Sequence, residues 1–362
     1  MKTLIFAVCL VAGLGVARAQ HVASSPSWDP KAAAGYMDAR QSWWMGWANA
    51  ARDHDTACVS CHTALPYALA RPALRAPLGE REMSPPERKM LEQVTKRVRL
   101  WKDVEPFYPD QTRGLPKTSE SRGTEAVLNA VILATHDAET GALSDDARQA
   151  FDNLWLLQFK AGDQTGAWAW LNFHYEPWEA NGSPYFGASL AAIAVGLAPG
   201  NYRSTPAIQD RLKLLRDYLQ KRADKEHLFN QAMALWASAK VSDILTPAQT
   251  QSIAQALIAK QQGDGGWTIA TLGPWKRVDE TELDTKSDGY ATGLIVHALQ
   301  QAGRSTTDPA VARGRAWLVA NQDHATGMWS ASSLNKRRDP ATDIGKFMSD
   351  AATAYAVLAL AK

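Results

Sequence analysis

The feature that most constrains the fold of this chain is a regular repeat of helix starts. Five segments open with a small polar residue followed by proline or acidic residues, at positions 85, 145, 206, 247 and 309. The intervals between these positions are 60, 61, 41 and 62 residues. A polar capping residue followed by proline is typical of a helix N-terminus. Two of the starts, Ser84 with Glu87 and Thr246 with Gln249, also have the spacing of capping boxes.

Each of these helices is followed by a second helix of a different kind. The first kind carries a one-sided apolar stripe, such as Leu91, Val94 and Val98, and is expected to be half exposed. The second kind is rich in small residues and apolar nearly all round, which predicts burial on every side. These second helices are expected at residues 125–135, 185–197, 227–239, 289–301 and 351–361. Half-exposed and buried helices that alternate at a fixed period predict a ring of two layers.

The segment before Ser84 supplies one more hairpin. Helices are expected at residues 30–52 and 63–74, so six hairpins are available to close a barrel. No alternating Val/Ile pattern interrupts the helices, which excludes a parallel sheet. We therefore predict an all-α fold, an (α/α)6 toroid with a buried central cavity. Residues 20–83 form its N-terminal hairpin and residues 84–362 its remaining repeats.

The first 19 residues resemble a secretory signal peptide. Lys2 precedes an apolar run from residue 4 to 16, and a small-x-small site ends at Ala19. We expect cleavage there and a periplasmic or secreted protein. Without these residues the chain carries 37 basic and 37 acidic side chains, so it offers no general field for nucleic acid. No later apolar run is long enough to span a membrane.

A loop motif recurs between the helices of a hairpin. Its fullest copy reads Arg313-Gly314, Leu318, Gln322, Gly327 and Trp329. Two further copies contain Gln262 with Trp267 and Gln158 with Trp168. In this motif the glutamine amide can bond groups at helix ends and the tryptophan can pack on the neighbouring repeat. We attribute most of the excess of tryptophan, 14 residues against 8 phenylalanines and 9 tyrosines, to this tying of hairpins.

These motifs resemble the QW repeats of squalene–hopene-type terpenoid cyclases, within the terpenoid cyclase/protein prenyltransferase α/α-toroid superfamily. The resemblance covers roughly residues 85–362 and implies an α/α toroid with an apolar isoprenoid-type ligand. The family protonates an alkene with an Asp-x-Asp-Asp acid, and this chain lacks that motif. Asp284, Asp288 and Asp350 are the candidate carboxyls, although Asp288 and Asp350 also suit helix caps. The zinc site of the prenyltransferases is not expected, because no cysteine follows Cys61.

The only cysteines after the leader are Cys58 and Cys61, in the sequence Cys-Val-Ser-Cys-His. This is the attachment motif of c-type haem, in which both thiols add to vinyl groups and His62 becomes the proximal iron ligand. A local disulfide or dithiol and a metal site with His62 and His54 are the alternatives. His227 and Met348 are the candidates for a sixth iron ligand, and His227 also suits a helix cap.

The leading hypothesis is an exported toroid that carries haem c, has a redox or electron-transfer role and meets a periplasmic redox partner. The alternative is a cyclase-like enzyme or isoprenoid-binding protein without the usual acid. A carbohydrate-active barrel would show a groove lined by tryptophan and two facing acids. A non-catalytic scaffold is the fourth hypothesis. Trp43, Trp44 and Trp47 on one helix suit either a porphyrin wall or a core.

Overall fold

A computed structural model describes residues 27–361, and the leader predicted at residues 1–19 lies outside the described residues. The outer helices are α1 (Pro30–Gly46), α4 (Pro85–Arg99), α7 (Asp145–Leu157), α9 (Gln209–Arg222), α11 (Pro247–Ile258) and α13 (Pro309–Ala320). The inner helices are α2 (Ala64–Ala70), α6 (Lys117–Thr140), α8 (Ser183–Leu197), α10 (Leu228–Ser238), α12 (Gly289–Gln301) and α14 (Phe347–Leu360). The short helices are α3 (Arg75–Leu78) and α5 (Asp110–Arg113), and the 3-10 turns are η1 (Ala48–Ala50), η2 (Arg71–Leu74), η3 (Tyr202–Ser204), η4 (Pro206–Ile208), η5 (Ala223–Lys225) and η6 (Ile269–Thr271).

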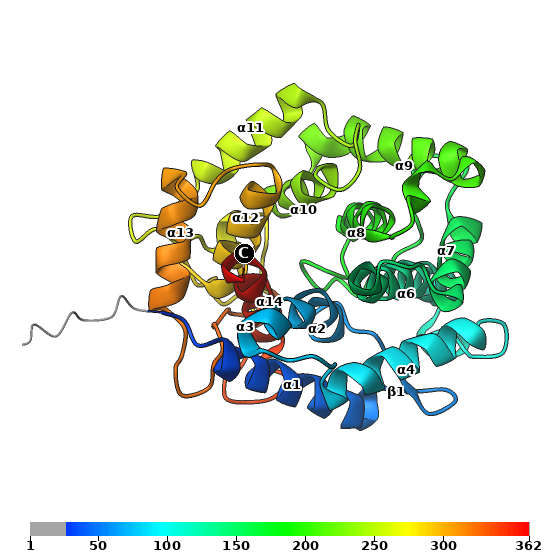
Figure 1. Cartoon of the computed structure of the whole chain (residues 1–362), viewed down its shortest axis with the longest axis horizontal. Helices are drawn as coiled ribbons and strands as arrows, with labels where there is room; N and C mark the ends of the chain where they lie inside the picture. The colour runs from blue at the N-terminus through cyan, green and yellow to red at the C-terminus, as the bar shows by residue number, and fades with distance from the viewer. Residues whose placement is uncertain (1–26, 362) are drawn as a thin grey trace, which may run out of the picture.

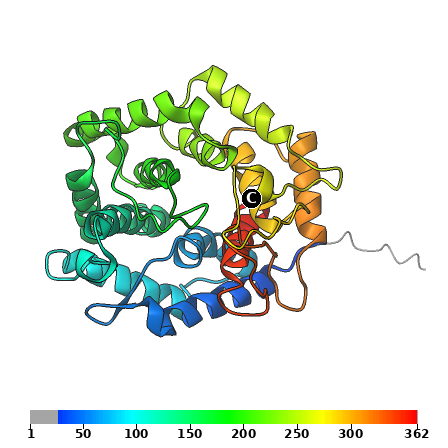
Figure 2. The same ribbon diagram turned by 180° about the vertical axis from the view of Figure 1, so that it is seen from behind.

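The inner helices pack side by side around a ring (Figure 1). Each one contacts the next in the order α2, α6, α8, α10, α12, α14, and α14 returns to pack against α2. The outer helices lie around them, and the view from behind shows the same two layers (Figure 2). The predicted all-α class is confirmed. No helix within residues 27–361 is both long and apolar enough to cross a membrane.

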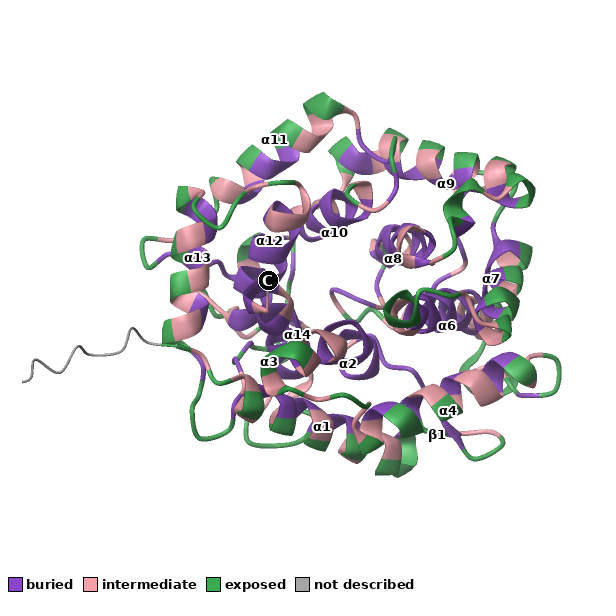
Figure 3. Cartoon of the chain, in the orientation of Figure 1, coloured by how far each residue is buried: buried purple, intermediate pink, exposed green. Residues whose placement is uncertain are grey.

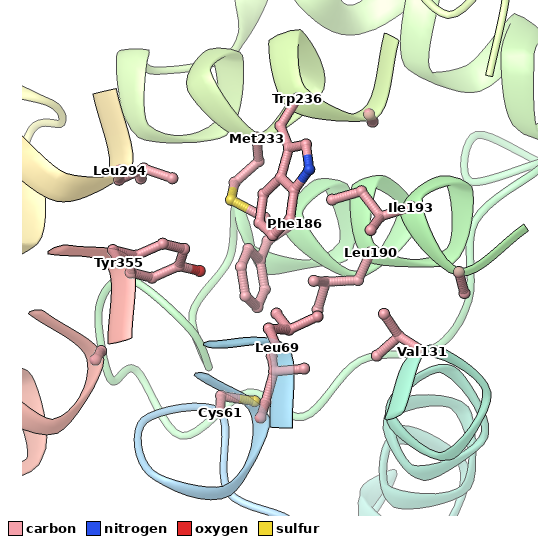
Figure 4. Packing of buried hydrophobic residues seen from close by; sticks show 14 of the residues in the cluster. Cys61, Leu69, Val131, Phe186, Leu190, Ile193, Met233, Trp236, Leu294 and Tyr355 are labelled. Carbon is pink, nitrogen blue, oxygen red and sulfur yellow. The ribbon is translucent and has the colours of Figure 1, made fainter. Parts of the chain in front are cut away.

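Burial separates the two layers as the sequence pattern predicts (Figure 3). The inner helices are buried nearly all round, whereas the outer helices alternate between buried and exposed positions. Apolar side chains from all six inner helices face the middle of the ring (Figure 4). Those labelled there include Leu69, Val131, Leu190, Trp236, Leu294 and Tyr355. The apolar interior therefore holds the ring together.

Several helix boundaries follow the predicted caps, and others do not. Ser84 with Glu87 and Thr246 with Gln249 form the two predicted capping boxes. The inner helix α6 begins at Lys117, well before the predicted start at residue 125, and the outer helix α9 begins after the turn η4. The helix predicted at residues 30–52 ends at Gly46. Beyond it, η1 leads into a short antiparallel pair, β1 (Ala51–Arg52) with β2 (Thr56–Ala57), in which Ala51 lies opposite Ala57.

The tryptophan of each loop motif is a buried link to its own outer helix. The indole nitrogens of Trp168, Trp267 and Trp329 each donate to a main-chain carbonyl near the end of the preceding outer helix, at 2.7 Å. All three side chains are almost fully buried. Each tryptophan thus fills the gap between layers and satisfies its own N–H group.

The glutamine of each motif connects one outer helix to the next. The side-chain amide of Gln158 donates to the carbonyl of Arg211 in α9, and that of Gln322 donates to the carbonyl of Asp29, the capping residue of α1. In the middle copy this role belongs to Gln261, which bonds the carbonyl of Ala310 in α13. The assignment of this role to Gln262 was therefore wrong by one residue.

Gln322 links the last outer helix to the first, so its loss should loosen ring closure. We predict that Gln322→Ala lowers the free energy of unfolding by about 1–3 kcal/mol, because partly buried main-chain groups of Asp29 and the buried carbonyl of Gly327 lose their partner. Urea unfolding followed by circular dichroism measures the change. Gln251→Ala, at an exposed position of α11, is the matched control and should change stability by less than about 0.5 kcal/mol. Equal stability of the Gln322 variant and the wild type would contradict the linking role.

Candidate functional site

The Cys58–His62 motif lies between β2 and α2, and main-chain hydrogen bonds fix its start. The amide of Cys58 donates to the carbonyl of Ala50 at 2.8 Å. The indole nitrogen of Trp44 donates to the carbonyl of Cys58 at 2.7 Å. Both main-chain groups of Cys58 are therefore held, one by the last residue of η1 and one by α1.

Ser60, the second residue between the cysteines, turns the chain into α2. Its hydroxyl oxygen accepts from the amides of Thr63 at 3.2 Å and Ala64 at 3.0 Å. The Ser60 hydroxyl thus bonds amides at the start of the helix as a cap does. Cys61 and His62 lie in the turn that leads into the first inner helix. The motif is thus a folded corner with a defined geometry.

A buried ion pair supports the strand that precedes the motif. Arg97 in α4 and Glu125 in α6 are fully buried, with Nε and Oε1 2.5 Å apart. Arg97 also donates to the hydroxyl of Thr56 in β2 at 2.9 Å. An outer helix, an inner helix and the strand before Cys58 therefore share one guanidinium group.

The motif lines a cavity of about 230 Å³ at the end of the ring where the inner helices begin. Aromatic rings form much of its wall, together with four residues of the motif, one carboxyl and one guanidinium group. The lining residues are Trp44, Trp47, Cys58, Ser60, Cys61, His62, Tyr108, Tyr175, Trp178, Glu179, Ser333, Asn335, Arg338, Ile344, Gly345, Phe347 and Met348. The wall therefore combines the first hairpin, the segment between α4 and α5, the loop before α8, the loop before α14 and the start of α14.

Both thiols are buried and unbridged in the structure. Cys58 is 6% exposed and Cys61 is 3% exposed. Burial raises the pKa of Cys58 to about 11 and raises the pKa of Cys61 as well. Cys61 belongs to the cluster of buried hydrophobic residues that Figure 4 shows. This environment favours neutral sulfur over the thiolate that nucleophilic or metal-binding cysteines need.

The imidazole ring of His62 is held on its faces and at one nitrogen. Its ring stacks on Phe347 with centroids 3.8 Å apart, and it meets Trp44 edge-on at 4.9 Å. Its Nδ1 lies 2.8 Å from the hydroxyl oxygen of Thr63. Burial, with Arg40 and Arg338 nearby, lowers the pKa of His62 to about 3. His62 is therefore a neutral, oriented imidazole.

Glu179 is a carboxyl in the cavity wall that the sequence analysis did not single out. Within residues 27–361 no hydrogen bond or ion pair joins its side chain to another group. Burial raises its pKa to about 7, against the opposing effect of Lys117 and Arg52. It lies on a tight turn where Tyr175 and Glu179 pair, outside any repeat motif, so no sequence signal marked it.

A more open groove of about 510 Å³ adjoins the cavity and shares Trp47, Arg338 and Ile344 with it. Its lining combines three basic residues with Trp43 and Trp47, whose rings stack with centroids 5.2 Å apart. The groove is lined by Trp43, Trp47, Lys336, Arg337, Arg338, Asp339, Thr342, Asp343 and Ile344. It contains tryptophan and two acids, but Arg40 binds Asp343 at 2.7 Å, so these acids are not a free pair.

Comparisons with known proteins add little to this geometry. No family model matches the chain, and no curated protein matches it. Among solved structures, a polysaccharide lyase aligns with 92% of this chain and 89% of its own, at 11% identity and a TM-score of 0.36.

The structure brings one of the two predicted sixth ligands to the motif. Met348, at the start of α14, lines the same cavity as His62 and is 3% exposed. His227 is instead the N-cap of α10, where its ring accepts from the amide of Asn230, and it packs edge-on to Trp275 at 4.8 Å. The cap interpretation of His227 is confirmed.

The three candidate carboxyls occupy three different settings. Asp284 is exposed and pairs with Arg277 at 3.1 Å. Asp288 caps α12 as expected, accepting from the amide of Ala291, and burial raises its pKa to about 6. Both line a recess of about 450 Å³ beside the motif cavity, and neither lines that cavity.

Asp350 is not a helix cap, and that expectation was wrong. Helix α14 begins at Phe347, so Asp350 lies inside its first turn. Its carboxylate accepts from Arg40, from Tyr36 and from Thr63, at 2.7 to 3.0 Å. The side chain is occupied by four donor groups of these three residues and is unavailable for capping.

The alternative metal site is also not assembled. In the part of the chain that the structure describes, no three His, Cys, Asp or Glu side chains come together as a metal-binding group. His54 is exposed and lies 2.8 Å from its neighbour Asp53. It therefore does not fold back onto the motif.

The cap role of His227 predicts a pH dependence. Burial lowers its pKa to about 4, so below pH 6.5 the unfolded chain binds a proton that the folded chain does not. The contribution of His227 to the free energy of unfolding is fully present above pH 6.5. It is lost as the pH falls toward 4. His227→Asn, which keeps a capping side chain, should reduce the decrease in unfolding free energy between pH 6.5 and 4 by at least about 1 kcal/mol. Urea unfolding at several pH values measures it, with exposed His324→Asn as control. An unchanged pH profile would contradict this account.

Proposed function

We propose that this chain carries a c-type haem attached through Cys58 and Cys61, and that it transfers electrons outside the cytoplasm. One observation carries the proposal: the two thiols, His62 and Met348 line one aromatic cavity. Imidazole and thioether are the axial ligands of electron-transferring haem proteins, and the bound haem would supply one-electron chemistry. The leader expected at residues 1–19 supports export, which haem attachment of this kind requires.

The chemistry of the residues fits this group. A thiol that adds across a vinyl group places its hydrogen on carbon and leaves a neutral thioether, so the attached product is compatible with a buried, uncharged sulfur. The aromatic wall suits a flat apolar macrocycle. The carboxylates of a haem would find Lys336, Arg337 and Arg338 in the adjoining groove. The cavity alone is below the usual range of about 300–1,000 Å³ for ligand sites, so a haem would draw on cavity and groove together.

The first test is covalent haem. The full-length chain, exported from a host that matures c-type haem, should give a haem-stained band on a denaturing gel and a haem absorption spectrum. Cys58→Ala with Cys61→Ala should remove the stain, because no thiol is left to form a thioether. His54→Ala, at an exposed site beside the motif, should keep it. An unstained wild-type band would overturn the proposal.

The second test concerns Met348. Met348→Leu keeps the volume and apolar character of the side chain but removes the sulfur. We expect the haem to stay attached, the ferric spectrum to lose the absorption band of a Met-bound iron, and the midpoint potential to fall. A spectrum and potential identical to those of the wild type would exclude Met348 as a ligand.

A second candidate is binding of an apolar, isoprenoid-type ligand, as the QW-like motifs imply. It is favoured by the rings that line the cavity with Glu179 among them. A carboxyl whose pKa is raised to about 7 is a weak acid for alkene protonation, which favours binding over cyclisation. A long-chain isoprenoid alcohol should quench the tryptophan fluorescence of the haem-free chain, and Trp178→Ala should weaken this binding. No quenching at saturating alcohol would exclude this candidate.

A further inference from the structure

A chain of hydrogen bonds runs from His62 to the contact between the first and last helices of the ring. Nδ1 of His62 lies 2.8 Å from the Thr63 hydroxyl oxygen, and that hydroxyl donates to Oδ2 of Asp350 at 2.7 Å. Asp350 is 5% exposed and also accepts from Nε and Nη2 of Arg40, at 2.7 and 3.0 Å, and from the Tyr36 hydroxyl at 2.8 Å. The carboxylate is therefore fixed by donors from α1 as well as by Thr63.

The proton count along this chain determines the form of the histidine. A guanidinium group has only donors, so the Asp350 oxygens act as acceptors. A hydroxyl has one hydrogen, and Thr63 has given its hydrogen to Asp350. Its oxygen can then meet His62 only as an acceptor, which requires the hydrogen of the neutral imidazole to sit on Nδ1. The lone pair of His62 is left on Nε2.

We propose that Asp350, acting through Thr63, is a positioning residue that selects Nε2 of His62 as the metal-binding nitrogen. It also makes Nε2 a stronger electron-pair donor to a metal. Histidines that bind metals commonly donate their other N–H to a carboxylate or a similar acceptor, which fixes the tautomer and makes the ligand more basic. Here the acceptor is a hydroxyl polarised by a buried carboxylate. The part that concerns iron rests on the proposed function, whereas the tautomer is a property of the chain itself.

The test begins without haem. In the full-length chain with Cys58→Ala and Cys61→Ala, which cannot attach haem, two-dimensional ¹H–¹⁵N spectra at pH 7 report the tautomer of His62. We expect Nδ1–H in this background. Thr63→Ser, which keeps the hydroxyl, should give the same tautomer, whereas Thr63→Val, which has the same shape without the hydroxyl, should shift the population toward Nε2–H. Nε2–H in the parent chain, or the same tautomer in all three chains, would overturn the proposal.

The second readout is the midpoint potential of the haem-loaded chains. Thr63→Val should shift the potential to more positive values, because a less basic imidazole stabilises the oxidised iron less. Thr63→Ser should leave it unchanged. Thr63→Val also removes one donor from the buried Asp350 carboxylate, so the thermal midpoint of each variant is measured and the potential is determined at a temperature where that variant is fully folded. Equal potentials in wild type and Thr63→Val would contradict the effect on donor strength. If the chain carries no haem, the proposed function is wrong, and the tautomer measurement still tests the role of Asp350 and Thr63.

Discussion

The hydrogen bonds accepted by the buried carboxylate of Asp350 connect the last helix of the ring to the first ones. The carboxylate joins the last inner helix, α14, to the first outer helix through Arg40 and Tyr36, and to the first inner helix through Thr63. A carboxylate withdrawn from water is tolerated only when its oxygens are fully hydrogen-bonded, and this one has four donors. If a donor were lost, an uncompensated charge would remain between three helices. These hydrogen bonds therefore fix the register in which the joined helices meet. Apolar contact between the helices adds to the stability.

The candidate site follows from this connection between the first and last helices. Its motif residues come from the first hairpin, while Phe347 and Met348 come from the start of α14. Arg40 also binds Asp343, in the loop that carries Arg338 over the cavity. One guanidinium group thus couples the Asp350 carboxylate to the loop at the cavity mouth. The fold and the site therefore share the buried Arg40–Asp350 ion pair.

The periodicity of the sequence was enough to predict the helical hairpins, their two layers and two capping boxes, because these depend on local spacing. Cys58, Cys61 and His62 could also be named, since they are adjacent in the chain. The positions of Glu179 and Arg40 could not be predicted. Nothing local marks either residue, and both reach the site only when segments distant in sequence meet; Arg40 and Asp350 are 310 residues apart. Asp350 was named as a cap because its neighbours match those of Asp288, but its helix begins at Phe347.

The burial of both sulfurs has a consequence for the order of assembly. Contacts between the two ends of a long chain form late, since they carry the highest contact order and the largest loop-closure entropy. In the closed ring Cys58 and Cys61 are 6% and 3% exposed, out of reach of any machinery that joins a bulky group to them. A covalent cofactor at this position would have to be installed on the open chain. Its flat apolar surface would then serve as a template around which the first and last helices meet.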